Sequence, residues 1–123
     1  MKRKPSIPKL RRECDRLWTA IIKAREKTCI VCRKNPVAHA HHIFAKSRHA
    51  HLRHDLRNGA AVCGGCHQEA HHNPVRPVMV ISQQVEDFGK LFFDAYHSRP
   101  SKPFTRQQFE NIRIALQEKG YLP

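Results

Sequence analysis

Cysteine and histidine are the residues of this 123-residue chain whose number and spacing could do chemistry, with 5 and 10 copies. Cys29 and Cys32 form one Cys-x-x-Cys pair, and Cys63 and Cys66 form a second. Such a turn presents two thiolates to one ion, and two pairs complete the tetrahedral shell that zinc prefers. We therefore predict a structural zinc ion, with a disulfide pair or iron as the alternative. Four thiolates leave no open ligand position, so this ion would stabilise the fold and do no chemistry.

Histidines gather between the two cysteine pairs and directly after the second pair. His67 and His71 are four residues apart on an expected short helix, so both imidazoles lie on one face and could bind one metal ion. A solvated helix face is the alternative. His41 and His42 are adjacent on an expected strand and point to opposite faces, so one can bind metal while the other acts on a different atom. His39 shares a strand face with His41 and could replace it as a ligand.

The run Ala40-His41-His42-Ile43, then Asn58, then Cys63-x-x-Cys66-His67-x-x-x-His71, resembles the HNH endonucleases. These enzymes belong to the ββα-metal, or His-Me finger, superfamily. The resemblance covers roughly residues 29–72 and is similar to the subset in which two Cys-x-x-Cys pairs hold a structural zinc, as in phage and prophage nicking endonucleases. It implies an α+β fold with a small, treble-clef-like ββα-metal core that zinc stabilises and that α-helices flank.

The resemblance also implies a role for each residue of the pattern. His42 is expected to be the general base, and His41, His67 and His71 the ligands of a catalytic divalent cation. Asn58 matches an asparagine that orients the base in some members and binds the ion in others; taken alone, it would be interpreted as a turn asparagine. An all-histidine set favours Zn²⁺, Ni²⁺ or Mn²⁺ over Mg²⁺ without excluding Mg²⁺.

The chemistry of these groups is suited to phosphodiester hydrolysis. A neutral imidazole, with a pKa near about 6.5, can take a proton from water near neutral pH. One divalent ion can stabilise charge on both the phosphate and the leaving oxygen.

The charge of the chain indicates a polyanionic partner, with solubility or localisation as the alternative. The formal net charge is +13, from 23 lysines and arginines against 10 aspartates and glutamates. Residues 1–27 carry ten basic and three acidic groups, and residues 33–57 carry six and one, whereas residues 76–123 carry seven and five. The excess therefore lies around the cysteine and histidine pattern, and we expect DNA as the partner. Phosphate contacts are expected from basic residues that flank the predicted hairpin, namely Lys46, Arg48, Arg53 and Arg57.

A single domain over residues 1–123 must position these groups, since this length fits one domain. Residues 28–74 are expected to form the core, with a strand, a loop, a second strand and a short helix over residues 37–44, 45–55, 56–62 and 64–72. Asn58 and Gly59 suggest a turn or bulge near the start of the second strand. Asn73 and Pro74 should end the short helix.

Helices are expected on both sides of this core. Residues 8–27 place apolar side chains at three- and four-residue spacing, with Cys14 on that stripe as a buried thiol rather than a fifth ligand. Residues 81–120 form a helical extension, with helices over 82–97 and 106–119. Ser82 is the expected N-cap of the first. Thr105 with Gln108 forms a capping box, Phe104 with Phe109 a hydrophobic staple, and Gly120 a stop for the second.

The combined pattern predicts a metal-dependent HNH endonuclease that nicks one DNA strand per active site. A non-catalytic zinc-knuckle module that binds DNA or RNA is the alternative, and a toxin-like DNase is a third possibility. We expect no small-molecule cofactor, no membrane partner, and a monomer or weak dimer. No apolar segment follows the basic N-terminus, so we expect no secretory signal, a cytoplasmic location, and cysteines that bind metal rather than form disulfides.

Overall fold

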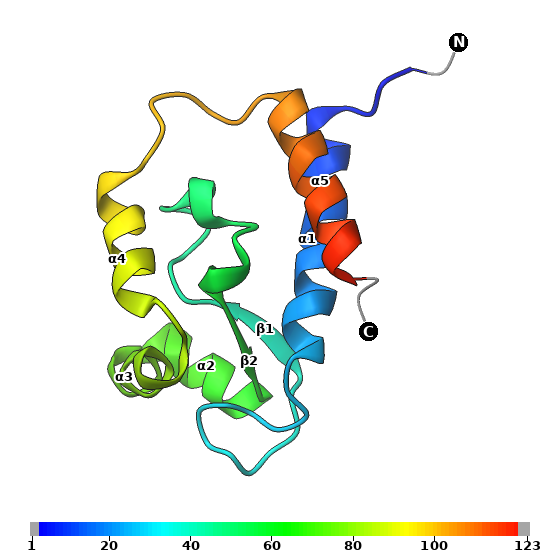
Figure 1. Cartoon of the computed structure of the whole chain (residues 1–123). Helices are drawn as coiled ribbons and strands as arrows, with labels where there is room; N and C mark the ends of the chain where they lie inside the picture. The colour runs from blue at the N-terminus through cyan, green and yellow to red at the C-terminus, as the bar shows by residue number, and fades with distance from the viewer. Residues whose placement is uncertain (1–2, 121–123) are drawn as a thin grey trace.

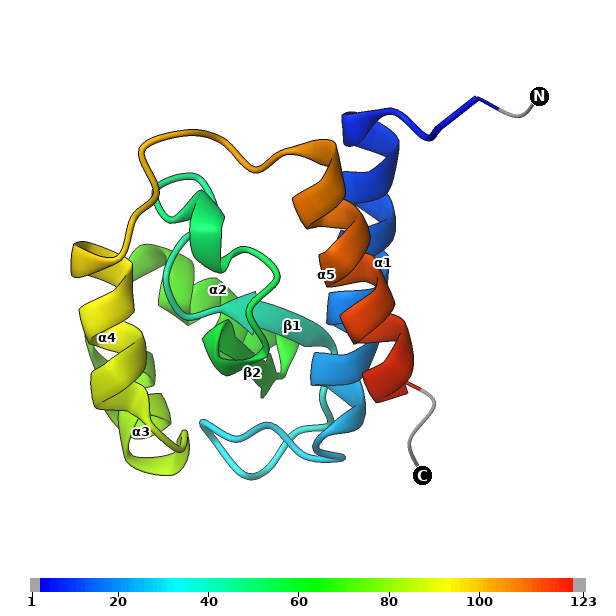
Figure 2. The same cartoon turned by 45° about the horizontal axis from the view of Figure 1, so that its top comes forward.

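The computed structural model describes residues 3–120, which form a small antiparallel hairpin between two groups of helices (Figure 1). The elements are α1 (Ile7–Ala24), β1 (His39–His42), β2 (Gly59–Val62), α2 (Gly64–His72), α3 (Val75–Gln84), α4 (Phe88–His97) and α5 (Arg106–Gly120). Helices α1 and α5 lie side by side on one flank of the hairpin, and α3 and α4 lie on the other (Figures 1 and 2). The mixed architecture confirms the α+β class.

Helix α1 forms because a capped start precedes a regular apolar stripe. The Ser6 hydroxyl accepts a hydrogen bond from the Lys9 N–H at 3.3 Å, which satisfies a free donor of the first turn. The buried residues of this stripe follow one another at four-residue spacing and are Leu10, Cys14, Trp18 and Ile22. The helix ends at Ala24, three residues before the predicted end. At this point the Arg25 guanidinium turns toward the hairpin and donates to the Leu56 carbonyl oxygen at 2.7 Å.

The hairpin pairs β1 and β2 in antiparallel register, with His41 opposite Ala60 and His42 opposite Gly59. Both strands are shorter than predicted. The second begins only at Gly59 because residues 56–58 form a single 3₁₀ turn, and a further 3₁₀ turn over residues 50–52 lies in the loop between the strands. Gly59 lets α1 approach the hairpin closely. A Cβ at this position would collide with the Ile22 side chain and lie 2.9 Å from Trp18 Cζ2, so glycine is required by space.

Helix α2 spans Gly64–His72, as predicted, and ends at Asn73. The single helix predicted over residues 82–97 is wrong. Helices α3 and α4 replace it, and the chain breaks between them at Asp87, which has a left-handed φ of 58°. Ser82 is therefore not an N-cap; it lies inside α3, where its hydroxyl donates to the Met79 carbonyl oxygen at 2.8 Å. Pro77 is compatible with α3 because it lies in the first turn, where backbone N–H groups have no carbonyl partner within the helix.

Helix α5 confirms both predicted signals at its start. The Thr105 N–H donates to Gln108 Oε1 at 2.7 Å, and the Gln108 N–H donates to Thr105 Oγ1 at 3.2 Å. The Phe104 and Phe109 rings pack with centroids 5.9 Å apart. The helix includes Gly120, the last residue that the structure describes. Among residues 3–120, no helix has the length and apolar character needed to cross a membrane.

Candidate metal centres and the hairpin site

The four cysteines of the two pairs converge on one point. Their Sγ atoms all lie within 4.8 Å of one another, and Cys29, Cys63 and Cys66 are buried. The loop that carries the first pair is fastened to β2, because the Ile30 N–H donates to the Ala61 carbonyl oxygen at 3.1 Å. Helix α3 covers the cluster with Ile81. This group could hold a structural metal such as zinc, as predicted.

Backbone hydrogen bonds favour the thiolate form at part of this cluster. Donors from residues 34 and 35 lower the pKa of Cys32 to about 6. The Cys66 N–H donates to Cys63 Sγ at 3.4 Å and lowers the pKa of Cys63, so this cysteine is also the N-cap of α2. Burial raises the pKa of Cys66 to about 12. A bound cation would stabilise the thiolate of Cys66 and so promote its ionisation.

Cys14 lies apart from this cluster. It is fully buried between α1 and α5, where its Sγ donates to the Phe109 carbonyl oxygen at 3.6 Å. Burial raises its pKa to about 11, and the neighbouring carboxylates of Asp15 and Glu13 add to the effect. Cys14 is therefore a buried thiol of the helix interface, as predicted.

Three histidines form a second cluster between β1 and α2. The ring nitrogens of His41, His67 and His71 lie within 4.8 Å of one another, and the His67 and His71 Nε2 atoms are 3.1 Å apart. Burial, followed by the two neighbouring imidazoles, lowers the pKa of His41 to about 4. A neutral imidazole has a free lone pair for a metal, so this donor set fits a divalent cation. His39 is exposed and stacks on the His67 ring at 4.6 Å, outside the set of three.

His42 faces the opposite side of β1, toward α1. Its ring stacks on Trp18 with centroids 4.0 Å apart and planes at 9°. Its Nε2 lies 3.0 Å from the Arg53 carbonyl oxygen. A carbonyl oxygen only accepts, so this contact requires the proton on Nε2 and leaves the Nδ1 lone pair free. Burial lowers the pKa of His42, which keeps the ring neutral near pH 7.

Helix α1 fixes the loop that supplies this carbonyl group. The Asp15 carboxylate accepts from Arg53 Nε at 2.8 Å and Nη2 at 2.7 Å, and it pairs with His54 Nε2 at 2.6 Å. Burial alone would raise the pKa of Asp15, but the hydrogen bonds from His54 and Arg53 outweigh it and lower the pKa. Trp18 Nε1 also donates to the Asp55 carbonyl oxygen at 3.0 Å. Two side chains of α1 therefore hold residues 53–55 beside His42.

Asp15 and Trp18 are functional candidates that sequence reasoning missed. Trp18 belongs to the regular apolar stripe of α1, which explains its position without any role at a site. Asp15 is one acidic residue on a basic helix. Neither residue carries a sequence signal for its partner, which is 37 or more residues away along the chain.

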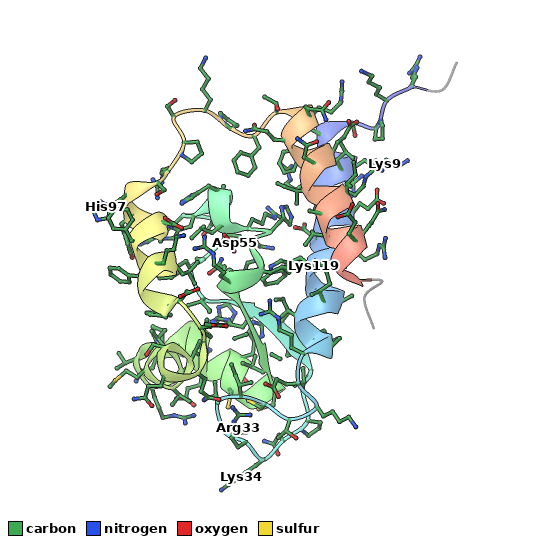
Figure 3. All side chains as sticks on the ribbon, viewed as in Figure 1. Lys9, Arg33, Lys34, Asp55, His97 and Lys119 are labelled. Atoms are coloured by element: carbon green, nitrogen blue, oxygen red, sulfur yellow. The ribbon has the colours of Figure 1, made fainter. Side chains whose placement is uncertain are left out.

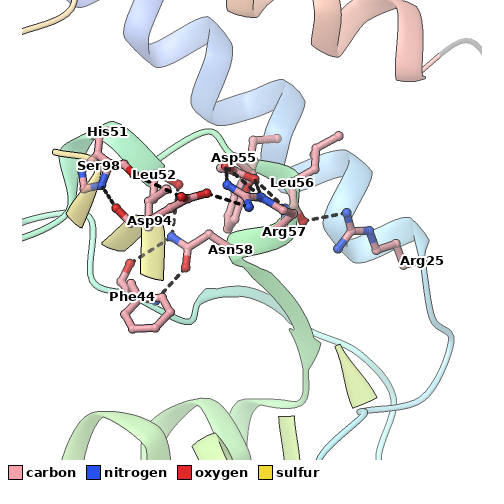
Figure 4. A network of polar contacts seen from close by, with 11 residues as sticks. Arg25, Phe44, His51, Leu52, Asp55, Leu56, Arg57, Asn58, Asp94 and Ser98 are labelled. Carbon is pink, nitrogen blue, oxygen red and sulfur yellow. Dashed lines mark hydrogen bonds and ion pairs between the residues drawn. The ribbon is translucent and has the colours of Figure 1, made fainter. Parts of the chain in front are cut away.

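Asn58 is fully buried and holds the loop that follows β1 (Figure 4). Its Oδ1 accepts from the Phe44 N–H at 2.7 Å, and its Nδ2 donates to the carbonyl oxygens of Phe44 at 3.0 Å and Leu52 at 3.1 Å. These bonds use the acceptor and both donors of the amide. Within the described residues, Asn58 has no hydrogen bond to His42 or to the histidine cluster. Any influence on His42 passes through the loop that Asn58 holds.

The four predicted phosphate-binding residues have different surroundings. Lys46 and Arg48 are exposed, and Lys46 is near enough to His42 to contribute to its lowered pKa. Arg53 is paired with Asp15, as described above. Arg57 is paired with Asp55 and, at 2.9 Å, with Asp94 of α4 (Figure 4). We therefore assign Arg53 and Arg57 first to ion pairs that hold the fold together, because carboxylates already neutralise their charges.

Comparisons with known proteins identify no relative. No family model matches the chain, and neither the curated proteins nor the solved structures include a significant match.

Proposed function

We propose that this chain is a metal-dependent endonuclease of the HNH type that hydrolyses DNA phosphodiester bonds. The observation that carries the proposal is the different surroundings of two adjacent histidines on β1. His41 joins two further imidazoles on the α2 side, and His42 presents a free Nδ1 lone pair on the α1 side. The succession of hairpin and helix, β1–β2–α2, supports the ββα-metal core that the sequence pattern implies.

His42 would act as the general base. Its Nδ1 can accept a proton from water, while the Arg53 carbonyl group and the Trp18 ring restrict rotation of the imidazole. Burial lowers the pKa of His42, so the neutral form is present near pH 7. This combination supplies a base with one defined tautomer and one defined orientation.

His41, His67 and His71 would hold the catalytic ion. When bound, a divalent cation at this position stabilises negative charge on the phosphate and on the leaving oxygen. Three protein ligands leave coordination positions for substrate, unlike the four thiolates of the cysteine cluster, which would hold structural zinc.

DNA is the proposed substrate because of charge. The chain carries a formal net charge of +13, and the exposed Lys46 and Arg48 lie on the loop that follows His42. One histidine site per chain can cut one strand at a time, so a single chain would nick duplex DNA.

A plasmid assay tests the proposal. Purified protein is incubated with supercoiled plasmid and added Mn²⁺, Mg²⁺, Zn²⁺ or Ni²⁺, with EDTA as the control. We expect conversion to nicked circles that depends on the metal. Binding without cleavage under all four metals would reject the enzyme and favour the alternative, a zinc-knuckle module that binds nucleic acid, which the cysteine cluster and the charge also support.

A further inference from the structure

A basic cleft is lined in part by the loop whose Arg53 carbonyl oxygen contacts His42. It has a volume of about 510 Å³ and lies between residues 47–53, the connection from α4 to α5 and the start of α1. Figures 1 and 2 show this connection arching from the end of α4 to the start of α5. Five basic side chains line the cleft: Arg11, Arg48, Arg53, Arg99 and Lys102. Among the described residues, no aspartate or glutamate lines it.

Most of this charge is not neutralised within the protein. Arg53 is paired with Asp15, and Arg99 donates to the Arg48 carbonyl oxygen at 2.6 Å, a bond that leaves the arginine charge in place. In residues 3–120, no carboxylate lies within 4.0 Å of the basic groups of Arg11, Arg48, Arg99 or Lys102. Four cations around one concave surface attract an anion with several charges.

The lining of the cleft is also partly apolar. Its apolar members are Ile7, Pro100, Pro103, Phe104 and Phe109. Guanidinium and ammonium groups together with apolar side chains match a nucleotide chain, whose phosphates are charged and whose sugars and bases present apolar faces.

One residue connects the cleft with the proposed base. The Arg53 side chain lines the cleft, while its carbonyl oxygen lies 3.0 Å from His42 Nε2. We infer that this cleft binds the sugar-phosphate backbone of the DNA beside the position of cleavage. This inference rests on the proposed function, since it extends the path of the same DNA strand away from His42.

The test compares two double variants in a His42→Ala background, which prevents cleavage during binding. Arg11→Gln with Lys102→Gln removes two charges from the cleft. Lys34→Gln with Lys119→Gln removes two exposed charges elsewhere; Figure 3 shows Lys34 on the loop below the hairpin, at the end of the molecule opposite the cleft. Binding of a fluorescent DNA duplex is measured by anisotropy over a range of salt concentrations, and thermal unfolding checks that each variant is folded.

We expect the cleft variant to bind roughly tenfold more weakly and to lower the slope of log K against log salt by about 1.8, as the loss of two phosphate contacts requires. The control variant should keep a slope close to that of the parent. Equal losses in the two variants would overturn the inference, because net charge alone would then explain them. An unchanged affinity of the cleft variant would also overturn it.

These outcomes are separate from the failure of the proposed function. A protein that never nicks plasmid but loses DNA binding only in the cleft variant would reject the enzyme and retain the cleft. A protein that nicks plasmid but binds DNA equally well in both double variants would retain the enzyme and reject the cleft.

Discussion

The cysteine cluster and the histidine cluster are two candidate metal sites of opposite design. Three of the four cysteines are buried, and the two pairs come from segments about 30 residues apart. In the histidine cluster only His41 is buried, while His71 lies on an exposed helix face. A closed, buried shell of thiolates suits an ion that holds segments together, and an open set of imidazoles suits an ion that must meet a substrate. The difference in burial and ligand number supports a stabilising role for the cysteine cluster and the proposed catalytic role for the histidine cluster.

The largest effect is expected from Cys63→Ser. Cys63 is both a member of the cysteine cluster and the N-cap of α2. Structural zinc contributes about 10–16 kcal/mol of apparent binding free energy in small zinc-binding peptides, which is comparable with the whole stability of a domain. We expect this variant to unfold or aggregate, as measured by thermal denaturation and zinc content.

Cys14→Ala is the matched control for that variant. It also removes a buried thiol, but one that lies between α1 and α5. It should retain its zinc and lose only modest stability. A Cys63→Ser protein with an unchanged melting temperature would refute the structural role of the cysteine cluster.

The next largest effect is expected from His42→Ala, on activity rather than on metal or DNA binding. A general base contributes about 10²–10⁴-fold to rate, so plasmid nicking should fall by at least about 100-fold. Zinc content and DNA affinity should not change, because His42 belongs to neither metal cluster. Quantified nicking rates, together with DNA-binding titrations, check both statements. Near wild-type nicking would remove His42 from the role of base.

A smaller and more selective effect is expected from His67→Ala, which removes one of three imidazoles from the open cluster. Calorimetric titration with Zn²⁺ or Mn²⁺ should show weaker binding of the second metal, with the melting temperature nearly unchanged. His72→Ala is the matched control, because His72 is exposed on the same helix and lies outside the cluster. Equal metal affinities in the two variants would take His67 out of the ligand set.

The smallest effect is expected from Asp15→Asn. This variant should bind metal at the cysteine and histidine clusters as the parent does. Hydrogen bonds to charged groups contribute about 1.5–3 kcal/mol each, and partial exposure of Asp15 reduces this, so we expect a loss of about 1–2 kcal/mol. Urea unfolding measures the difference from the parent.

The pH dependence of that difference follows from the lowered pKa of Asp15. A carboxyl whose folded pKa is depressed contributes stability above its unfolded pKa of about 3.9, and this contribution is lost as pH falls toward the folded pKa. The gap between parent and variant should therefore shrink as the pH falls below about 4. A gap that widens below about pH 4 would contradict this assignment.

Sequence pattern predicts the elements whose ends carry chemical signals. Helix α2 lies where it was predicted because Cys63 caps its start and Asn73 and Pro74 follow its end. The predicted helix over residues 82–97 continues past the break because apolar residues continue through Val85 and Phe88, and the prediction misses residues 75–81 of α3. The left-handed turn at Asp87 has no sequence signal, since aspartate is compatible with many conformations.

Sequence pattern also groups the candidate ligands but not the partners of charged side chains. The spacing of His67 and His71 on one helix face fixes their proximity, as the structure shows. The charges of Arg53 and Arg57 are evident in the sequence, yet Asp15 and Asp94, which neutralise them, come from helices far away along the chain. Which basic side chains remain unpaired and able to bind phosphate therefore depends on how α1 and α4 pack against the hairpin loop.

Cys66 and His67 are consecutive residues in the first turn of α2, so a single peptide bond joins the two clusters. A shift of the Cys66 backbone would therefore also move His67. An ion held by the four thiolates would in this way also fix the position of an imidazole of the second cluster.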